Sequence, residues 1–281
     1  MVAQPNVRLN LANTAENVVV VRAVLAGVAE SVGVDTEDLG DIRTAVSEAC
    51  NNVVQHAYEG QRGPLDVTIA LSQETIEVAV RDRGIGIGEH AEEDPSLGRG
   101  TGIGLHVIRT LARDARFDEP PGGGTRVRLT FAARGTRPAG EGVAGGPELD
   151  LTEMPNYAAA VSIAPVGLAK AIVPRLAVAL AARAHFSTDR LSDVQLLSDA
   201  VADHAVKAVC DRHVSFGILA QPRDLELRIA PLALGQADGL VRASQLDGLG
   251  RVIEKLVDRH HILAAEAHET LALSVLDPRS R

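Results

Sequence analysis

The most informative stretch of this chain runs from Ser47 to Ala57 and reads SEACNNVVQHA. On a helix, Glu48 and Asn52 lie one turn apart on one face, with Gln55 close to it. A carboxylate and an amide placed in this way can serve one polar site, because the amide oxygen suits Mg²⁺ and the carboxylate can orient or deprotonate a nucleophile. In isolation the same pattern is more typical of a solvated helix face with an i, i+4 pair.

A second polar stretch, Asp82–Gly88, reads DRGIGIG and directly follows a strand-like run. A carboxylate at a strand end can accept a hydrogen bond from an exocyclic amine such as adenine N6, and the glycines allow the backbone to approach the base. For this stretch alone a surface turn remains an equal alternative, because Asp and Gly are common turn residues.

A third stretch, Gly98–Leu105, reads GRGTGIGL and precedes a predicted helix. Glycines before a helix N-terminus expose backbone N–H groups and the positive end of the helix dipole to phosphate. The spacing of Gly100, Gly102 and Gly104 does not fit G-x-G-x-x-G, and the GK[ST] of a P-loop is absent. A Rossmann or Walker site is therefore disfavoured.

Hydrophobic periodicity predicts an α+β fold for residues 1–132. Two helices are expected near the N-terminus, one capped by Asn13 or Thr14 and one beginning after Gly33. The other expected elements are a helix at 105–112 and strands at 7–11, 65–71, 75–80 and 125–131, with a tight turn at 72–74. Consecutive hairpin strands with helices on one face favour a two-layer α/β sandwich over a doubly wound parallel sheet.

The second half of the chain echoes the first. Gly, Pro and charged residues dominate residues 133–154 and periodicity is lost there, as in a linker. Residues 155–281 then repeat four blocks in the same order at nearly constant spacing, for example LELRI at 225–229 against IEVAV at 76–80. We expect a duplicated domain, with chance similarity between two α+β domains as the alternative.

The second copy is expected to lack the polar chemistry of the first. The residues that stand opposite Glu48, Asn52 and Asp82 are, in that order, Ala200, His204 and Pro231. A pocket without the carboxylates and the amide should bind a nucleotide poorly, so we expect residues 155–281 to be degenerate.

Composition argues against several classes of function. The net charge of −9 disfavours a nucleic-acid binder that works by bulk electrostatics. Cys50 and Cys210 are too far apart for a disulfide framework, and both are expected to be buried. The chain begins without an apolar signal core and has no apolar run of about 18 residues, so we expect a cytoplasmic protein without a membrane span.

Together the three stretches resemble the N, G1 and G2 boxes of the GHKL (Bergerat) superfamily of ATP-binding domains, which includes gyrase, Hsp90, histidine kinases and MutL. The sequence SEACNNVVQHAY at 47–58 is similar to the N box of anti-sigma-factor serine/threonine kinases of the RsbW and sporulation type. VVRAVLAGVAE at 20–30 and GRGTGIGL agree with that branch. The resemblance covers about residues 7–132, and a phosphoacceptor helical pair is missing, which argues against an ordinary sensor histidine kinase.

The resemblance implies ATP and Mg²⁺ as cofactors and assigns a role to each site residue. Asn52 would coordinate Mg²⁺, Glu48 would be the general base, and Asp82 would bind the adenine amine. The residues implied in shaping the adenine pocket are Gly84 and Gly86, and those implied in wrapping the phosphates are Gly100, Thr101, Gly102, Gly104 and Leu105.

Two arginines receive further roles from the resemblance. Arg99 would steady the transferred phosphoryl group, since a cation there offsets developing charge. Arg22 falls where the family meets its sigma factor.

The implied function is an ATP-dependent serine/threonine protein kinase and anti-sigma factor that phosphorylates an anti-anti-sigma (STAS-type) partner. The alternatives are a non-catalytic ATP-binding module that regulates protein–protein interaction and an ATP hydrolase with a conformational role. The expected assembly is either a pseudo-dimer within the chain or a homodimer.

Overall fold

The computed structural model describes residues 5–86, 103–132, 159–210, 212–246 and 250–278. The chain divides into two compact units, Met1–Ala139 and Gly140–Arg281, which are treated separately below. The predicted linker at 133–154 lies outside the described residues.

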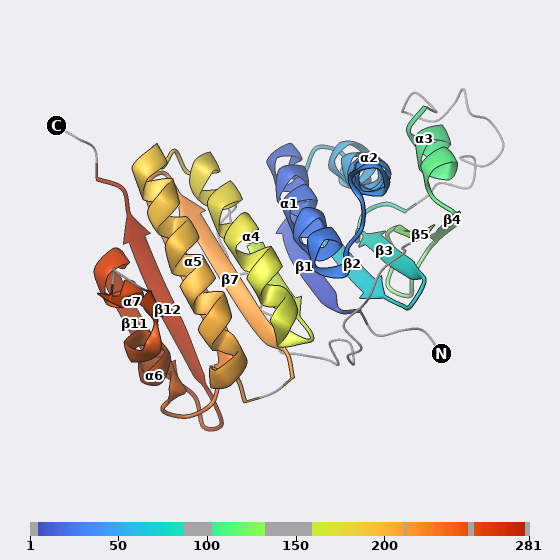
Figure 1. Ribbon diagram of the computed structural model, residues 1–281. Helices are drawn as coiled ribbons and strands as arrows, with labels where there is room; N and C mark the ends of the chain where they lie inside the picture. The colour runs from blue at the N-terminus through green and yellow to red at the C-terminus, as the bar shows by residue number, and fades with distance from the viewer. Residues whose placement is uncertain (1–4, 87–102, 133–158, 211, 247–249, 279–281) are drawn as a thin grey trace. The chain divides into compact units, whose positions relative to one another are not determined.

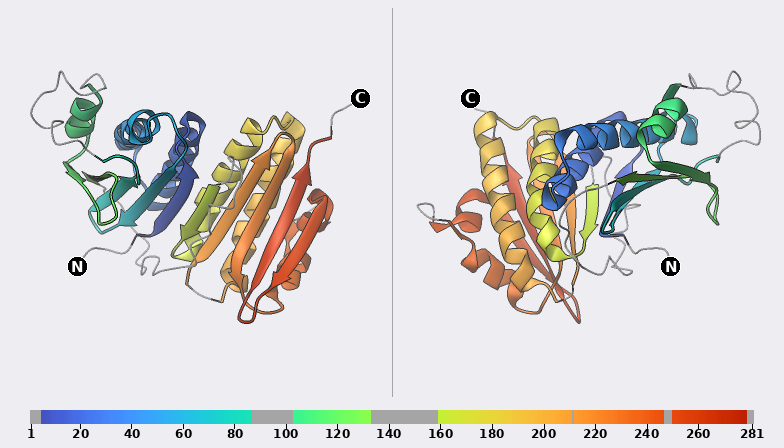
Figure 2. Two further views of the ribbon diagram at one scale, coloured as in Figure 1. Left: turned by 180° about the vertical axis from the view of Figure 1, so that it is seen from behind. Right: turned by 45° about the vertical axis from the view of Figure 1, so that its right-hand side comes forward.

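The first unit has two layers, an antiparallel sheet and helices on one of its faces (Figures 1 and 2). The strand order is β1-β2-β3-β5-β4. The elements are β1 Val7–Ala12, α1 Ala15–Val32, α2 Thr36–Asn52, the π-helical turn η1 Val53–Ala57, β2 Pro64–Leu71, β3 Thr75–Arg81, α3 Ile103–Leu111, β4 Asp114–Asp118 and β5 Arg126–Ala132. The α+β class and the antiparallel hairpins expected from the sequence are confirmed.

Alternation along the strands builds the core between the two layers. Val67, Val78 and Leu129 face the helices and are at most 1% exposed, while their strand neighbours are only half-buried. The helices contribute Val24 and Val46, both fully buried. Each such side chain stabilises the fold by about 1.5–3 kcal/mol, so the apolar period fixes which face of each element turns inward.

The helix caps agree only in part with the sequence. Gly33 ends α1 in the left-handed conformation, at φ 70°, and Asp35 caps α2 by accepting the Asp38 N–H at 2.8 Å. Thr14 occupies the N-cap position of α1 but makes no side-chain capping bond. Asn13, the other expected cap, instead bonds to the loop before β2, because its amide reaches Gln61 O at 3.1 Å.

Strand β4 is not predicted by the sequence. It reads DARFD, in which Phe117 is the single large apolar residue, and it pairs with β5 at the end of the strand order. Arg109 of α3 lies 5.9 Å from the centre of the Phe117 ring. Charged residues on an outermost strand discourage pairing with another chain, which explains why this strand lacks the usual alternation.

One prediction about the cysteines is wrong. Cys50 is buried in α2, and burial raises the pKa of its thiol to about 12. Cys210 is exposed, because it follows the last residue of α5 instead of lying inside the helix. Within the described residues, no helix combines the length and apolar character needed to cross a membrane.

The second unit has the same order of strands and helices as the first, with additional short elements. Its sheet order is β6-β7-β8-β12-β11, with helices on one face (Figure 1). The elements are β6 Ala159–Ile163, the 3₁₀ turn η3 Val166–Leu168, α4 Ala169–Arg183, α5 Thr188–Ala208, β7 Val214–Gln221, β8 Asp224–Leu232, α6 Gln236–Ala243, β9 Gln245–Leu246, β10 Gly250–Arg251, α7 Val252–Leu256, β11 Arg259–Ala264 and β12 Glu269–Leu276.

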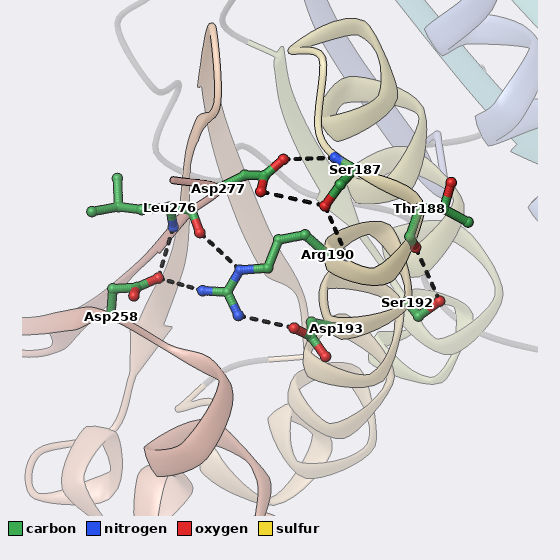
Figure 3. Close-up of polar contacts among 8 residues, drawn as sticks. All are labelled: Ser187, Thr188, Arg190, Ser192, Asp193, Asp258, Leu276 and Asp277. Atoms are coloured by element: carbon green, nitrogen blue, oxygen red, sulfur yellow. Dashed lines mark hydrogen bonds and ion pairs between the residues drawn. The ribbon is translucent and has the colours of Figure 1, made fainter. Parts of the chain in front are cut away.

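A polar network joins the start of α5 to the end of β12 (Figure 3). The buried Asp277 carboxylate accepts the Ser187 backbone N–H at 2.6 Å and the Ser187 hydroxyl at 3.3 Å. It also lies 3.3 Å from Arg223 Nη1. The Ser187 hydroxyl in turn accepts the Arg190 N–H at 3.4 Å, which caps α5.

Arg190 completes this network. Its Nε donates to Leu276 O at 2.8 Å and its Nη1 to Asp193 at 2.9 Å, while Nη2 pairs with Asp258. Asp258 also accepts the Leu276 N–H at 2.7 Å. The first turn of α5 is therefore held against the end of the sheet by charge-assisted hydrogen bonds as well as by apolar packing.

Replacing Asp277 with Ala should destabilise the second unit by about 1–3 kcal/mol, because the Ser187 N–H loses its acceptor and Arg223 keeps only the Asp277 backbone oxygen. Urea unfolding combined with amide hydrogen exchange in α5 and β12 measures this. Asp238→Ala is the control: that carboxylate pairs with Arg242 on the exposed surface, and its loss should cost under about 0.5 kcal/mol. Equal effects of the two substitutions would contradict the role assigned to the network.

Candidate functional site

The first part of the site lies where the start of α3 packs against α2. A Cβ added at Gly104 would come 3.1 Å from Glu48 Oε2 and 3.8 Å from Asn52 Oδ1. Both side chains are half-buried, and neither has a hydrogen-bond partner among the described residues. The structure thus brings together three of the residues singled out in the sequence and leaves two hard oxygen donors available to a ligand.

Gln55 does not join this group. It lies in the π-helical turn η1 and is exposed. The helical period that relates Glu48 to Asn52 ends at Asn52, because η1 has a different number of residues per turn.

The second part of the site is the turn that follows β3. Asp82 is 3% exposed, and its Oδ1 accepts the Gly84 N–H at 2.8 Å and the Thr125 N–H at 3.1 Å. Its backbone N–H donates to Thr125 O at 2.9 Å. Within the described residues, Oδ2 accepts no hydrogen bond, so one carboxylate oxygen is fixed by the backbone and the other can accept from a ligand N–H.

Glycines allow this turn to approach its neighbours. A Cβ at Gly84 would come 1.9 Å from Ala57 O, and the adjacent Ile85 N–H donates to that same oxygen at 3.0 Å. Gly86 has φ 79°, and a Cβ there would come 2.9 Å from Glu119 Oε1. The two glycines therefore hold the turn close to the end of η1 and to the segment after β4.

Sequence reasoning missed the segment that supports Asp82 from the other side. Gly122, Gly123 and Gly124 all have φ between 79° and 97°, which is the left-handed region. A Cβ at Gly124 would come 2.2 Å from Asp82 O. The run of three glycines directly before a predicted strand was the available signal, and Thr125 follows it.

Several expected phosphate ligands cannot be located. Arg99, Gly100, Thr101 and Gly102 lie outside the described residues. Leu105, on the first turn of α3, is 38% exposed.

The donors present fit a metal ion that arrives with a nucleotide. No cluster of three or more His, Cys, Asp or Glu side chains occurs in the part of the chain that the structure describes. Mg²⁺ in nucleotide sites takes one or two protein oxygens and completes its shell with phosphate and water. The Asn52 amide oxygen beside Gly104 at the start of α3 fits that requirement as a single protein ligand, with the Glu48 carboxylate next to it.

Comparison with known proteins agrees with this geometry. Residues 11–131 match the family model described as a histidine kinase-like ATPase domain. The chain is 30% identical over 128 residues to the serine-protein kinase RsbW of Bacillus mycoides (strain KBAB4), which aligns 40% of this chain with 76% of that protein. The RsbW of Bacillus cereus (strain ATCC 10987 / NRS 248) is 30% identical over 125 residues, with the same coverage.

A solved structure, the blue-light activated histidine kinase of Erythrobacter litoralis EL346, is 29% identical over 34% of this chain and 31% of that chain. Its TM-score of 0.29 is too low to support a comparison of the folds.

Gly84→Ala should destabilise the first unit by about 1–3 kcal/mol and displace Asp82, because the added methyl group overlaps Ala57 O. Gly40→Ala is the matched control: it lies on α2 with nothing within 4 Å of the added Cβ, and alanine favours a helix by up to about 1 kcal/mol. Thermal unfolding of both variants measures the difference. A Gly84→Ala protein as stable as Gly40→Ala would refute the close approach.

Proposed function

Through residues 11–131 this chain belongs to the histidine kinase-like ATPase family that includes the RsbW serine-protein kinases, and we propose on that basis that it is an ATP-dependent serine/threonine protein kinase. The observation that carries the proposal is the position of Gly104 against both Glu48 and Asn52. This arrangement puts a potential base and a potential metal ligand beside the helix start expected to meet phosphate.

Each described site residue then has a task that its geometry supports. Asp82 Oδ2 accepts the adenine amine while Oδ1 remains held by the backbone. Asn52 Oδ1 is a ligand for Mg²⁺, and Glu48 accepts the proton of the acceptor hydroxyl. Bound MgATP supplies the phosphoryl group and neutralises charge as that group is transferred.

The proposal extends to residues outside the described part of the site. Gly100, Thr101 and Gly102 complete the backbone that faces the phosphates, and Arg99 offsets the charge that develops on the phosphoryl group. Gly104 and Leu105 belong to the first turn of α3, and their backbone N–H groups are proposed to face the phosphates as well.

We further propose that the acceptor is a serine or threonine of an anti-anti-sigma (STAS-type) protein and that the kinase also binds a sigma factor. The similarity to RsbW serine-protein kinases supports this choice. Arg22 is exposed on α1 and is available for such a contact.

The second unit is proposed to be a degenerate copy without a nucleotide site. Ala200 is buried, and the ring Nδ1 of His204 bonds to Ala200 O at 2.8 Å. Pro231 lies inside β8. Helices α6 and α7 bury apolar side chains such as Leu240 and Ile253. We propose that this unit serves as a structural partner within the chain.

Glu48→Gln should keep ATP affinity within about threefold of wild type and reduce phosphoryl transfer at least about 100-fold, because the substitution removes the base and preserves its shape. Transfer from labelled ATP to a STAS-domain protein measures the rate. Glu37→Gln, on the exposed first turn of α2, is the control and should transfer normally.

Asp82→Asn, unlike Glu48→Gln, should act on nucleotide affinity, and we expect it to weaken ATP binding at least about tenfold. Unchanged affinity in that variant would refute the adenine assignment. A wild-type protein that binds ATP and transfers nothing to any STAS domain would instead favour the non-catalytic regulatory module.

Calorimetric titration of the full chain with MgATP should give one bound nucleotide per chain. The reason is that Ala200, His204 and Pro231 stand in the second unit opposite Glu48, Asn52 and Asp82 of the first. A stoichiometry of two would refute the degenerate copy.

A further inference from the structure

Tyr58 links two parts of the first unit that meet at the adenine side of the site. Its hydroxyl donates to Pro64 O at 2.6 Å and accepts the Arg83 backbone N–H at 2.8 Å. Burial is the largest cause of the raised pKa of this phenol, so the hydroxyl stays protonated and can make both bonds at once.

The ring of Tyr58 is held from behind. A Cβ added at Gly63 would come 2.2 Å from Tyr58 Cε1, so the ring packs directly on the Gly63 backbone. Asn13, which is 7% exposed, fixes that backbone: its Oδ1 accepts the Gly63 N–H at 2.8 Å and its Nδ2 donates to Gln61 O at 3.1 Å. The hydroxyl therefore reaches Arg83 from a rigid support.

The bond to Arg83 acts on the peptide that follows Asp82. Thr125 holds the Asp82 carboxylate and backbone on one side, and Ala57 holds Ile85 on the other. Tyr58 adds a fixed point at the Arg83 N–H between them, on a peptide that also packs against the Gly124 backbone. Loss of the hydroxyl should therefore loosen the Asp82–Arg83 peptide without releasing the contacts that flank it.

We propose that Tyr58 is a positioning residue that sets the preference of this site for adenine over guanine. The inference rests on the proposed function. A carboxylate accepts hydrogen bonds and donates none, so Asp82 favours the exocyclic amino group of adenine and repels the keto oxygen that guanine carries at the same place. This discrimination requires the free carboxylate oxygen of Asp82 to keep a fixed direction. If the carboxylate could rotate, a water molecule could bridge it to guanine and reduce the penalty for that base.

The first test compares the dissociation constants for MgATP and MgGTP by calorimetry on the full chain. Tyr58→Phe removes the hydroxyl and keeps the ring. We expect ATP binding to weaken about tenfold and GTP binding to change less than about threefold, since hydrogen bonds of ordinary strength are lost from adenine recognition alone. Ser72→Ala, which deletes hydroxyl bonds in the β2–β3 turn, is the control. It should leave unchanged the ratio of the GTP dissociation constant to the ATP dissociation constant.

A second variant perturbs the same contact from the other side. Gly63→Ala keeps the hydroxyl and displaces the ring. The ratio of the GTP dissociation constant to the ATP dissociation constant should therefore fall, as it does in Tyr58→Phe. Gly40→Ala is its matched control. Melting temperatures of all four variants separate a change in recognition from a loss of fold, because a merely structural role would weaken both nucleotides together.

The outcomes distinguish this inference from the proposed function. If the wild type binds ATP selectively and the ratio stays unchanged in Tyr58→Phe and Gly63→Ala, or if both nucleotides weaken equally, Tyr58 does not set selectivity. If the wild type binds neither nucleotide, or binds both equally, the nucleotide assignment of the proposed function itself fails.

Discussion

The first unit depends on one close approach, in which the carbonyl oxygen of Ala57 lies against the Cα of Gly84. No residue with a side chain fits there, since a Cβ would come within 1.9 Å of that oxygen. The contact fixes the end of the α2–η1 segment to the turn after β3. Because Glu48 and Asn52 lie on α2 and Asp82 lies in that turn, this approach sets the spacing between the two parts of the site.

The π-helical turn η1 gives that contact its geometry. It begins directly after Asn52 and ends at Ala57. A π turn holds more residues than an α turn, so it changes the phase of everything after Asn52. The residues whose direction it sets are Ala57 and Tyr58, the two that contact the turn after β3. Turns of this kind occur often at functional sites, and here one joins the helix that carries Glu48 and Asn52 to the turn that carries Asp82.

The two units show how one framework can carry different interiors. Among the described residues, the main sheet of each unit has five antiparallel strands in the same order, and two long helices follow its first strand. In the first unit, the polar side chains of Glu48 and Asn52 lie beside Gly104. In the second, the apolar side chains of Val252 and Ile253 on α7 are fully buried. The framework tolerates both because sheet and helix packing depend on the apolar period alone, whereas binding depends on a few polar positions.

The helices and strands with a clear apolar period, and the pairing of Glu48 with Asn52, are predictable from the sequence because a helical repeat is a local property. Strand β4 could not be predicted, because its charged sequence shows no alternation of apolar and polar residues. The exposure of Cys210, just past the end of a helix, could not be predicted either. The support of Asp82 by Tyr58, Gly124 and Thr125 becomes visible only in the folded chain. These contacts join segments far apart in the chain, and their formation depends on the paths of loops and on positive φ angles that no local pattern specifies.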